Sequence, residues 1–432
     1  MDREQNQLLT RSGPGTPGGE VLRSYWQPAA LAEELSGDRP VVPVHLLGEE
    51  LVLFRDELDR LGLIGRFCPH RGVDLSFGRL EDGGLRCPFH GWLLDVEGTC
   101  LETPAEPLGS TFHTRVSHNS YPVVERNGII WAWLGEGQPP ELPGLDCFVA
   151  PQQQVFAFKG MWDCNWLQAH EVGIDPVHAA FLHRFLDDED EIYGQQFRDT
   201  VAGTGITVAK LMREASAPTI TAEPTDFGFR MRTLRDYRGE FTHVRISNCI
   251  FPNAITIAMS REISITQWHV PIDDVSCYWY SMFVSYGEAV DGETMGAQRR
   301  ANVQLPEYRP TTSAENRWGF DPEEQRVRTF TGMGTDINVH DQWAVESPGP
   351  VYERTNEHLS PSDVGIRTHR RMLLAALRQP GPDTLIGAAD PAALRGPAAI
   401  DAVTTDDDYD SAWRNLETSR RVASGWAPAL TE

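Results

Sequence analysis

Two cysteines and two histidines stand close together in the first quarter of the chain, in a spacing that can hold a metal. The segment CPH supplies Cys68 and His70, and the segment CPFHGW supplies Cys87 and His90. Such a set can hold a structural zinc ion, or a Rieske-type [2Fe–2S] cluster with two cysteines on one iron and two histidines on the other. Zinc loops usually place about two to four residues between paired ligands. The single residue between Cys68 and His70 and the glycine-containing turns after both histidines favour the cluster.

A second pattern follows at residues 165–184, NWLQAHEVGIDPVHAAFLHR, which contains Asp175, His178 and His183. On an ideal helix, two residues five positions apart point about 140° away from each other, because each residue turns about 100°. The two histidines could therefore be ordinary polar surface residues. A shared ligand role requires a helix end or a widened turn between them. The residues alone leave both interpretations open.

The two cysteine–histidine segments resemble the ligand loops of Rieske non-haem iron oxygenases. The matching text is CPHRG at 68–72 and CPFHGW at 87–92. Respiratory-chain Rieske proteins carry two further cysteines in these loops, whereas this chain has Val73 and Phe89 there. The resemblance is therefore to the oxygenase and ferredoxin branch. It implies a [2Fe–2S] cluster on Cys68, His70, Cys87 and His90.

Residues 165–184 are similar to the mononuclear-iron segment of the same oxygenases, in the phthalate-dioxygenase-like branch. That branch has an Asn-Trp-Leu-Gln stretch, a glutamate and then Asp-x-x-His-x4-His, and this chain has the same order. The resemblance implies that His178 and His183 are two ligands of a 2-His-1-carboxylate Fe(II) site. It also implies that Asp175 links the iron-site histidine of one subunit to a Rieske histidine of its neighbour. Electrons would then pass from His90 across a subunit boundary to Asp175 and His178.

The third iron ligand must be a carboxylate from far along the chain. Residues 340–374 also resemble the phthalate-type branch, in which the ligand is an aspartate four residues before an apolar position and a Glu-Ser pair. Asp341 matches that aspartate, and Glu346 is the later acid of the pattern. Asp336 is the near alternative. Without the resemblance, each of these acids would be interpreted as a solvated surface group.

The resemblance also implies a function, that of a terminal oxygenase with a [2Fe–2S] cluster, a mononuclear Fe(II) and O2 as co-substrate. The chain contains no dinucleotide fingerprint or flavin loop, so electrons from NAD(P)H must arrive through a separate flavin- and ferredoxin-type reductase. The expected reaction is hydroxylation, by cis-dihydroxylation, of an aromatic carboxylate of the phthalate or benzoate type. Monooxygenation or O-demethylation of a methoxylated aromatic acid is the alternative, because the same metal centres serve it. A Rieske electron carrier is a further alternative, although it would need only about 100 residues.

Arg245 is the candidate for substrate recognition. In the segment FTHVRISN, strand alternation places His243, Arg245 and Ser247 on one face. That face of the strand could simply be exposed to solvent. The sharper interpretation is that Arg245 pairs with a substrate carboxylate, because a planar guanidinium suits bidentate recognition. Phthalate-type enzymes use an arginine in this way.

The bulk composition limits the other possibilities. Of 432 residues, 40% are apolar and 23% charged, which suits a globular chain with two cored domains. A net charge of −24 without Lys/Arg clusters argues against nucleic-acid binding. No apolar run reaches the ~20 residues of a membrane span, and the N-terminus does not resemble a secretory signal. Seven cysteines, an odd number, indicate reduced thiols in a cytoplasmic protein, and those outside the cluster motif should be small buried hydrophobes.

These motifs require elements that position them, and the predicted fold class is α+β. We expect a small all-β Rieske domain at 40–150 and a catalytic domain at 151–378, with an antiparallel sheet flanked by helices in a helix-grip (START-like) arrangement. Residues 1–39 should be an N-terminal extension packed on the catalytic domain, and 379–432 an irregular tail. An inter-subunit role for Asp175 requires a ring of subunits. The expected assembly is a homotrimer or a stacked hexamer.

Overall fold

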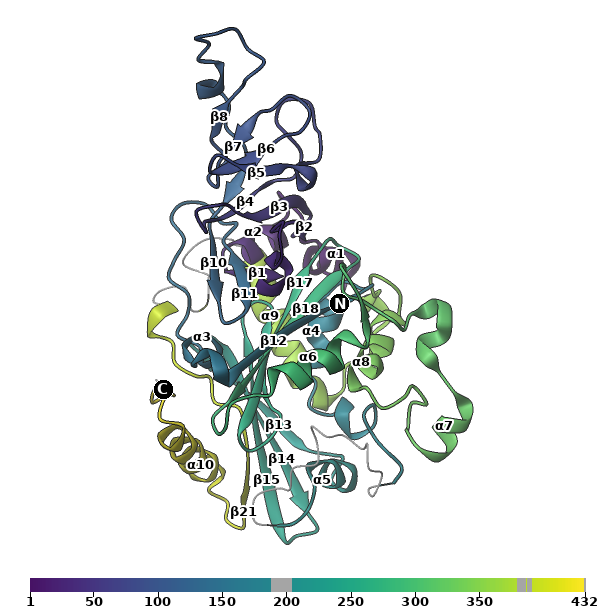
Figure 1. Cartoon of the computed structure of the whole chain (residues 1–432). Helices are drawn as coiled ribbons and strands as arrows, with labels where there is room; N and C mark the ends of the chain where they lie inside the picture. Colours follow the sequence, from purple (N-terminus) through teal and green to yellow (C-terminus); the bar gives the residue numbers. More distant parts are fainter. Residues whose placement is uncertain (188–203, 379–385, 387–390, 431–432) are drawn as a thin grey trace. The chain divides into compact units, whose positions relative to one another are not determined.

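The computed structural model describes residues 1–187, 204–378, 386 and 391–430 (Figure 1). The chain divides into a smaller unit, Ser12–Pro140 with Val270–Asp273, and a larger unit, Met1–Arg11 with Glu141–His269 and Asp274–Glu432. Residues 12–39 therefore belong to the smaller unit, whereas they were predicted to be part of an extension packed on the catalytic domain. The predicted domain boundaries at residues 40, 150 and 378 remain predictions.

The smaller unit consists of three sheets of short antiparallel strands (Figure 1). The first sheet has the order β1(Gln27–Leu31), β11(Ile129–Ala132), β10(Val123–Arg126). The second has the order β2(Val41–Leu46), β3(Glu49–Arg55), β4(Leu61–Gly65), β9(Ser120–Tyr121). The third has the order β5(Arg79–Glu81), β6(Gly84–Arg86), β7(Leu93–Leu94), β8(Cys100–Glu102), and α2(Pro17–Arg23) precedes them all.

The core between the second and third sheets contains the two predicted cluster cysteines. Buried Val52, Phe54 and Leu85 pack in one cluster with Cys68 and Cys87. Both thiols therefore lie at the edge of an apolar core, where the surrounding side chains exclude water.

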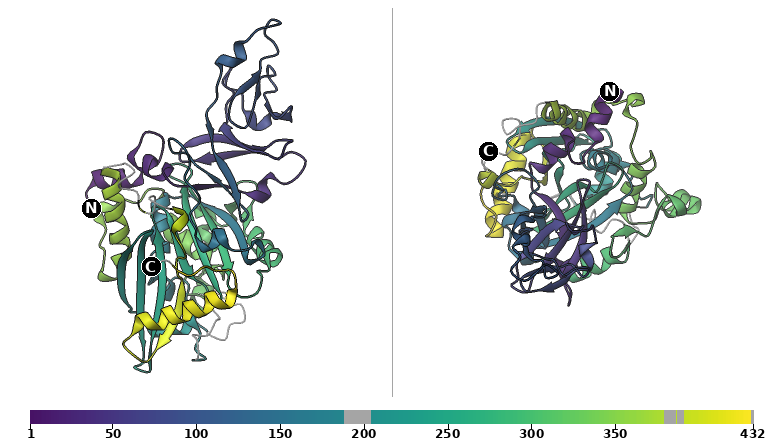
Figure 2. Two further views of the ribbon diagram at one scale, coloured as in Figure 1. Left: turned by 90° about the vertical axis from the view of Figure 1, so that its left-hand side faces the viewer. Right: turned by 90° about the horizontal axis from the view of Figure 1, so that it is seen from above.

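The larger unit is built on an eight-stranded sheet of long strands, in which the paired strands run antiparallel (Figure 2). The order is β12(Val155–Trp162), β18(Cys277–Ser285), β17(Ile263–Pro271), β16(Ala254–Ala258), β15(Phe241–Ile250), β14(Gly228–Tyr237), β13(Thr219–Thr225), with β21(Ile400–Thr404) paired to β15. A short hairpin joins β19(Val303–Gln304) and β20(Arg309–Pro310). The predicted α+β class, with a small β domain and a larger domain built on an antiparallel sheet, is confirmed.

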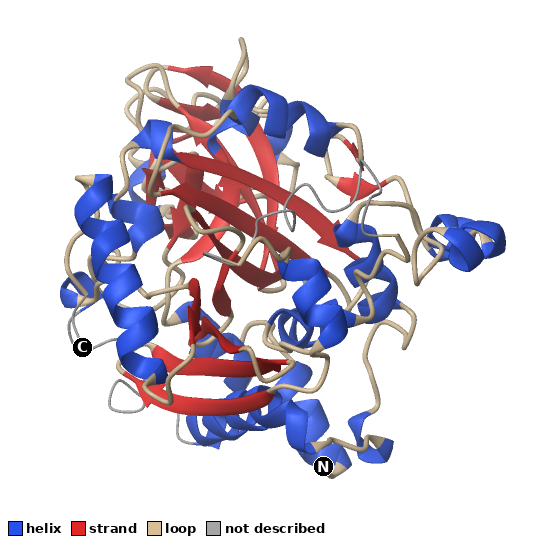
Figure 3. Ribbon diagram, turned by 90° about the horizontal axis from the view of Figure 1, so that it is seen from below, coloured by secondary structure: helices blue, strands red, loops and turns tan. Residues whose placement is uncertain are grey.

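Figure 3 shows the helices in blue beside the red strands. Those of the larger unit are α1(Arg3–Thr10), α3(Asp146–Val149), α4(Trp166–Gly173), α5(Val208–Glu214), α6(Gly292–Arg300), α7(Pro322–Val327), α8(Ile337–Glu346), α9(Val364–Arg378) and α10(Tyr409–Ser424). Among the described helices, none is both long and apolar enough to cross a membrane.

The prediction of an irregular C-terminal tail is wrong for residues 400–424. Strand β21 pairs with β15, and α10 packs over this pair through Trp413 against Val244 and Ile246 (Figure 2). The Pro/Ala/Asp-rich composition of this segment did not predict either element. Strand β21 has only five residues and depends on its partner strand for stability. Residues 379–385, 387–390 and 431–432 of the predicted tail lie outside the described part of the chain.

Candidate metal sites and the adjoining pocket

The two predicted cluster loops share one backbone turn, although their ligand spacings differ. In the first loop, Cys68 N–H donates to the Val73 carbonyl at 2.8 Å and Gly72 N–H donates to the Cys68 carbonyl at 2.9 Å. In the second, Cys87 N–H donates to the carbonyl five residues later at 2.8 Å, and Gly91 N–H donates to the Cys87 carbonyl at 3.0 Å. Gly72 and Gly91 have φ angles of 70° and 75°, a left-handed conformation that glycine adopts without steric cost. These glycines let both loops turn tightly around one point.

The four predicted ligands form a cysteine pair and a histidine pair at these turns. Cys68 and Cys87 are 3% and 2% exposed, and burial together with the neighbouring Cys87 raises the pKa of Cys68 to about 11. The rings of His70 and His90 lie 4.5 Å apart, and Trp92 stacks on His70 at 4.4 Å. His90 Nδ1 is buried without a hydrogen-bond partner in the described part of the chain. A buried imidazole nitrogen without a hydrogen-bond partner fits a ligand of the implied cluster.

The second predicted motif lies where a helix ends. Helix α4 stops at Gly173, and His178 begins a single 3₁₀ turn, His178–Ala180, so no continuous α-helix connects His178 to His183. The two imidazoles meet edge to face, with ring centroids 5.1 Å apart. Two residues five positions apart point away from each other only on an ideal helix. This objection to a shared ligand role for His178 and His183 therefore does not apply.

Asp341 on α8 completes the group. Its Oδ1 lies 3.3 Å from His183 Nε2 and 3.8 Å from His178 Nε2, and one ligand atom from each residue lies within 4.8 Å of the others. That Oδ1 is buried and has no hydrogen-bond partner within the described residues. Burial alone would raise the pKa of Asp341, but the two imidazoles lower it overall. Two neutral imidazoles and one ionised carboxylate are the donor set of a 2-His-1-carboxylate iron site, so these residues fit the implied metal.

The outer nitrogens of both histidines are already engaged, which fixes the tautomers. His178 Nδ1 donates to the Asp175 carbonyl at 2.6 Å. His183 Nδ1 lies 3.4 Å from His340 Nδ1, and His340 Nε2 donates to the Gly334 carbonyl at 3.0 Å. Both Nε2 atoms are thus left to face Asp341, as in metal-bound histidines whose outer nitrogen is held by a carbonyl or a second group. His340 was not predicted from the sequence, although its position next to Asp341 was a signal.

The alternative acids lie in other surroundings. Asp336 caps α8 by accepting the Asn338 N–H at 3.0 Å. Glu346 accepts from the Trp318 indole N–H at 2.7 Å. The structure groups neither of them with His178 and His183.

Asp175 lies at the edge of this group. Its Oδ1 accepts the Val177 N–H at 2.8 Å, and its Oδ2 lies 4.0 Å from His178 Nδ1. The side chain is 26% exposed, so part of the carboxylate is available to solvent or to another molecule. The buried Arg235 on β14 donates from Nη2 to the Pro176 carbonyl at 2.7 Å and so holds the loop that contains both Asp175 and His178.

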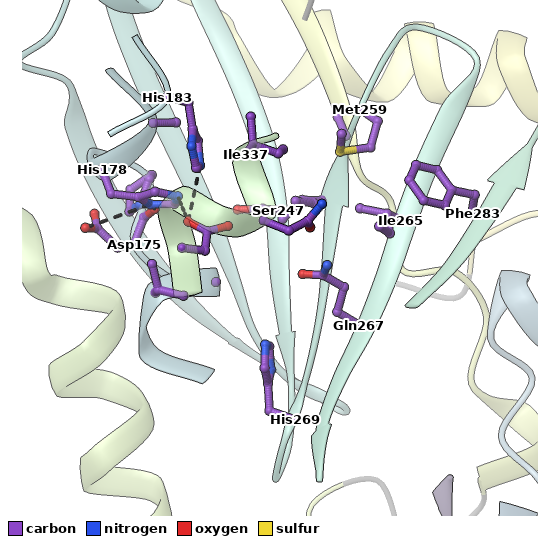
Figure 4. Close-up of a pocket in the computed structure, with 18 of the residues that line it drawn as sticks. Asp175, His178, His183, Ser247, Met259, Ile265, Gln267, His269, Phe283 and Ile337 are labelled. Carbon is purple, nitrogen blue, oxygen red and sulfur yellow. Dashed lines mark hydrogen bonds and ion pairs between the residues drawn. The ribbon is translucent and has the colours of Figure 1, made fainter. Parts of the chain in front are cut away.

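A pocket of about 110 Å³ adjoins His178, His183 and Asp341. In Figure 4 the two histidines lie at one side of it, and Ile265 and Phe283 lie at the other. Its polar side chains include Ser247, Gln267 and His269. Its apolar wall includes Phe158, Trp162, Val172, Met231, Ile257, Met259, Ile265 and Phe283. A larger cavity of about 740 Å³ also borders Asp175 and His178.

Arg245 lines this pocket, but a carboxylate of the same chain holds it. Arg245 Nε and Nη2 donate to the two oxygens of Asp401 on β21, at 2.7 and 2.6 Å. His243 Nε2 lies 2.9 Å from the same carboxylate. Burial would raise the pKa of Asp401, but Arg245 and His243 lower it well below its usual range. Asp401 was missed because the tail of the chain was expected to be irregular.

Comparison with known proteins matches both units to one family. Residues 25–116 match the Rieske [2Fe-2S] domain, and residues 133–430 match a domain described as LigXa C-terminal domain like. The chain is 34% identical to the oxygenase subunit of tert-butanol monooxygenase / tert-amyl alcohol desaturase from Aquincola tertiaricarbonis, over 87% of this chain and 77% of the relative. It is 32% identical to the oxygenase subunit of phthalate 4,5-dioxygenase from Pseudomonas putida, over 87% and 85% of the two chains.

A solved structure of dicamba monooxygenase bound to dicamba has the same fold. It matches with a TM-score of 0.57 at 19% identity, over 83% of this chain and 98% of that one. The sequence matches confirm the predicted enzyme class and its cofactors, a Rieske [2Fe–2S] cluster and a mononuclear iron that works with O2. The chain belongs to the Rieske non-haem iron oxygenases, in the branch that contains the oxygenase subunit of phthalate 4,5-dioxygenase.

Proposed function

We propose that this chain is the terminal component of a multicomponent system that hydroxylates a small aromatic compound with O2. The observation that carries the proposal is the convergence of His178, His183 and Asp341 beside a small, mainly apolar pocket. Electrons come from NAD(P)H through a separate flavin- and ferredoxin-type reductase. The relatives named above, which are oxygenase subunits, support this division of labour.

The residues divide between the two metal centres as follows. Cys68 and Cys87 bind one iron of the cluster, and His70 and His90 bind the other. His178, His183 and Asp341 bind the mononuclear iron. When bound, the cluster supplies single electrons and the mononuclear iron activates dioxygen.

The protein positions the ligand atoms and excludes water from the site. Because the outer nitrogens of His178 and His183 are held by Asp175 and His340, the ligand atoms are preorganised on one side of the site. The opposite side faces the pocket, where the apolar wall excludes water from the reacting atoms. A substrate in this pocket would lie beside the residues that would hold the iron.

Asp175 is assigned the link between subunits. Its partly exposed carboxylate bonds to the turn that contains His178, so a histidine of another subunit could approach its free oxygen. This role requires a closed ring, and a homotrimer or a stacked hexamer satisfies it.

The substrate is assigned to the phthalate and benzoate type, with ring cis-dihydroxylation as the favoured reaction and O-demethylation or other monooxygenation as the alternative. Arg245 is the residue proposed to bind a substrate carboxylate. Two of its guanidinium N–H groups already donate hydrogen bonds to Asp401. A substrate carboxylate would share Arg245 with Asp401. A neutral aromatic compound would instead contact the apolar wall and Gln267 or His269.

Reconstitution with a reductase tests the proposal. Together with the reductase, the purified chain should consume NAD(P)H and ¹⁸O2 in the presence of aromatic acids or their neutral analogues. The products should contain the ¹⁸O label. The reduced protein should show the rhombic, low-average-g resonance of a Rieske cluster, and iron analysis should give about three irons per chain. An electron carrier would give the resonance with about two irons and no labelled product, which would refute the proposal.

A further inference from the structure

A second cluster of metal-binding side chains lies in the core of the larger unit. Its members are His170 on α4, Cys249 on β15 and His369 on α9 (Figure 1). One ligand atom from each lies within 4.8 Å of those from the other two. All three residues are 0% exposed. None of them is a ligand in the function proposed above.

The two imidazoles are oriented by nitrogens on their outer sides. His369 Nε2 donates to the Pro252 carbonyl at 2.7 Å, so its Nδ1 carries a lone pair. That Nδ1 is buried and has no hydrogen-bond partner among the residues that the structure describes. His170 presents Nε2 to Cys249 Sγ at 3.5 Å, while its Nδ1 lies 3.3 Å from His269 Nδ1. In metal-binding histidines, one nitrogen likewise faces the ion while a carbonyl or another group holds the second.

A simple hydrogen bond explains only part of this arrangement. The Cys249 thiol can donate to His170 Nε2, which satisfies both groups. The lone pair of His369 Nδ1 then remains buried and unpaired, and an unpaired buried acceptor costs free energy. A cation at the centre of the three residues would satisfy all of them at once.

The donor set selects the kind of cation. A thiolate with two neutral imidazoles suits the thiophilic d¹⁰ ions Zn²⁺ and Cu⁺. Hard cations such as Mg²⁺ and Ca²⁺ prefer oxygen ligands, which this cluster does not offer. With Cu⁺ the buried site is neutral, whereas Zn²⁺ leaves one positive charge and normally takes a fourth ligand.

We propose that Cys249 Sγ, His170 Nε2 and His369 Nδ1 bind a single Zn²⁺ or Cu⁺ ion, which joins α4, β15 and α9. Binding displaces the thiol proton to solvent as the metal–sulfur bond forms. The ion stabilises the wall behind the pocket, because His170 contacts His269, which lines it (Figure 4). The site does not depend on the proposed function, since His170, Cys249 and His369 are not among the ligands assigned there.

X-ray absorption on the iron-loaded protein tests the site without interference from iron, because each absorption edge belongs to one element. Separate samples are dialysed against Zn²⁺ alone and, anaerobically, against Cu⁺ alone. We expect one of the two metals to be retained with a sulfur neighbour at about 2.3 Å and nitrogen neighbours at about 2.0–2.1 Å. A zinc ion that entered the His178, His183 and Asp341 site would show only nitrogen and oxygen neighbours. Retention of neither metal, or neighbours without sulfur, would overturn the proposal.

Variants assign the signal to these residues. Cys249→Ser and, separately, His369→Gln should lose the retained ion and keep the three irons. Cys147→Ser is the matched control, since that equally buried thiol bonds to Thr266 and should keep the ion. If Cys249→Ser does not fold, the wild-type spectrum and His369→Gln still decide the question. A sulfur signal that survives both substitutions would contradict the assignment.

Discussion

Asp401 faces Arg245 across the pairing of β21 with β15, and two hydrogen bonds of 2.7 and 2.6 Å join the carboxylate to the guanidinium. The side chains are 10% and 12% exposed, so the pair is largely removed from water. A strand late in the chain therefore sets the charge of one wall of the pocket.

Replacing Asp401 with Asn should destabilise the protein. Removing one partner of a buried ion pair leaves the other charge uncompensated, which typically costs about 3–5 kcal/mol. Because the folded protein lowers the pKa of Asp401, the pair contributes stability at neutral pH, and that contribution is lost only as the pH falls through the lowered pKa. Urea unfolding should therefore show a wild-type advantage at neutral pH that shrinks in strong acid. The exposed Asp406→Asn is the control, and an equal effect there would contradict the prediction.

Arg245→Gln should distinguish carboxylated from neutral substrates. If Arg245 recognises a substrate carboxylate, KM for aromatic acids should rise by about 10–100-fold, the range for losing one charge-assisted contact of about 1.5–3 kcal/mol. KM for the matching neutral aromatic compounds should change little. Steady-state kinetics with both substrate series measures this, and equal changes in the two series would remove the carboxylate role.

Asp341→Ala should remove the mononuclear iron and leave the cluster in place. Iron content should fall from about three to about two per chain, because the cluster keeps its own four ligands. The Rieske resonance should persist while product formation stops. Asp336→Asn and Glu346→Gln are matched controls from the same helix region, and loss of iron in either of them would transfer the ligand role to that acid.

Asp175→Asn should separate metal binding from electron transfer. Both centres should remain occupied, since Asp175 donates no ligand atom in the proposed assignment. Turnover should fall by about 10–100-fold, the usual cost of removing a group that hydrogen-bonds a metal ligand. Rapid-mixing oxidation of the reduced cluster by O2 in the presence of substrate reports the step directly. Normal rates with full product yield would exclude the bridging role.

The two glycines of the cluster loops should differ in their tolerance of substitution. Each has a positive φ, which costs a non-glycine residue about 1–2 kcal/mol. At Gly72 a Cβ would meet no atom within 4 Å, whereas at Gly91 it would lie 2.7 Å from the Pro104 ring. Gly91→Ala should therefore lose more cluster than Gly72→Ala, as measured by iron content and visible absorbance per chain. Equal losses would mean that backbone strain alone governs both positions.

Short-range patterns in the sequence were sufficient to predict the two loops that contain the predicted cluster ligands, and the assignment of the cluster to them stays a prediction. The spacing of Cys68, His70, Cys87 and His90 reflects two local turns, and no distant residue is needed to form either of them. A shared ligand role for His178 and His183 required a break in the helix between them, but the residues themselves did not predict that break. A 3₁₀ turn after α4 has no distinct sequence signature. Asp341 was identified by resemblance, because its approach to the histidines depends on a tertiary contact of high sequence separation.

The parts that escaped prediction depend on long-range packing. Asp401 and His340 act through partners far away in sequence or through a ring orientation that only the folded chain defines. Likewise, His170 and His369 look like isolated polar residues in helical segments until β15 brings Cys249 between them. Periodicity and composition describe single elements, so they do not report which buried side chains meet.

The pairing of β21 with β15 also has a consequence for biosynthesis. The ribosome makes β15 long before it makes β21, so the nascent chain carries the Arg245 guanidinium without its counter-charge while the next 156 residues are added. The final charge balance of the pocket wall is reached only when β21 joins the sheet. A chain truncated before residue 401 would fail at this last assembly step, even though every predicted metal ligand had already been synthesised.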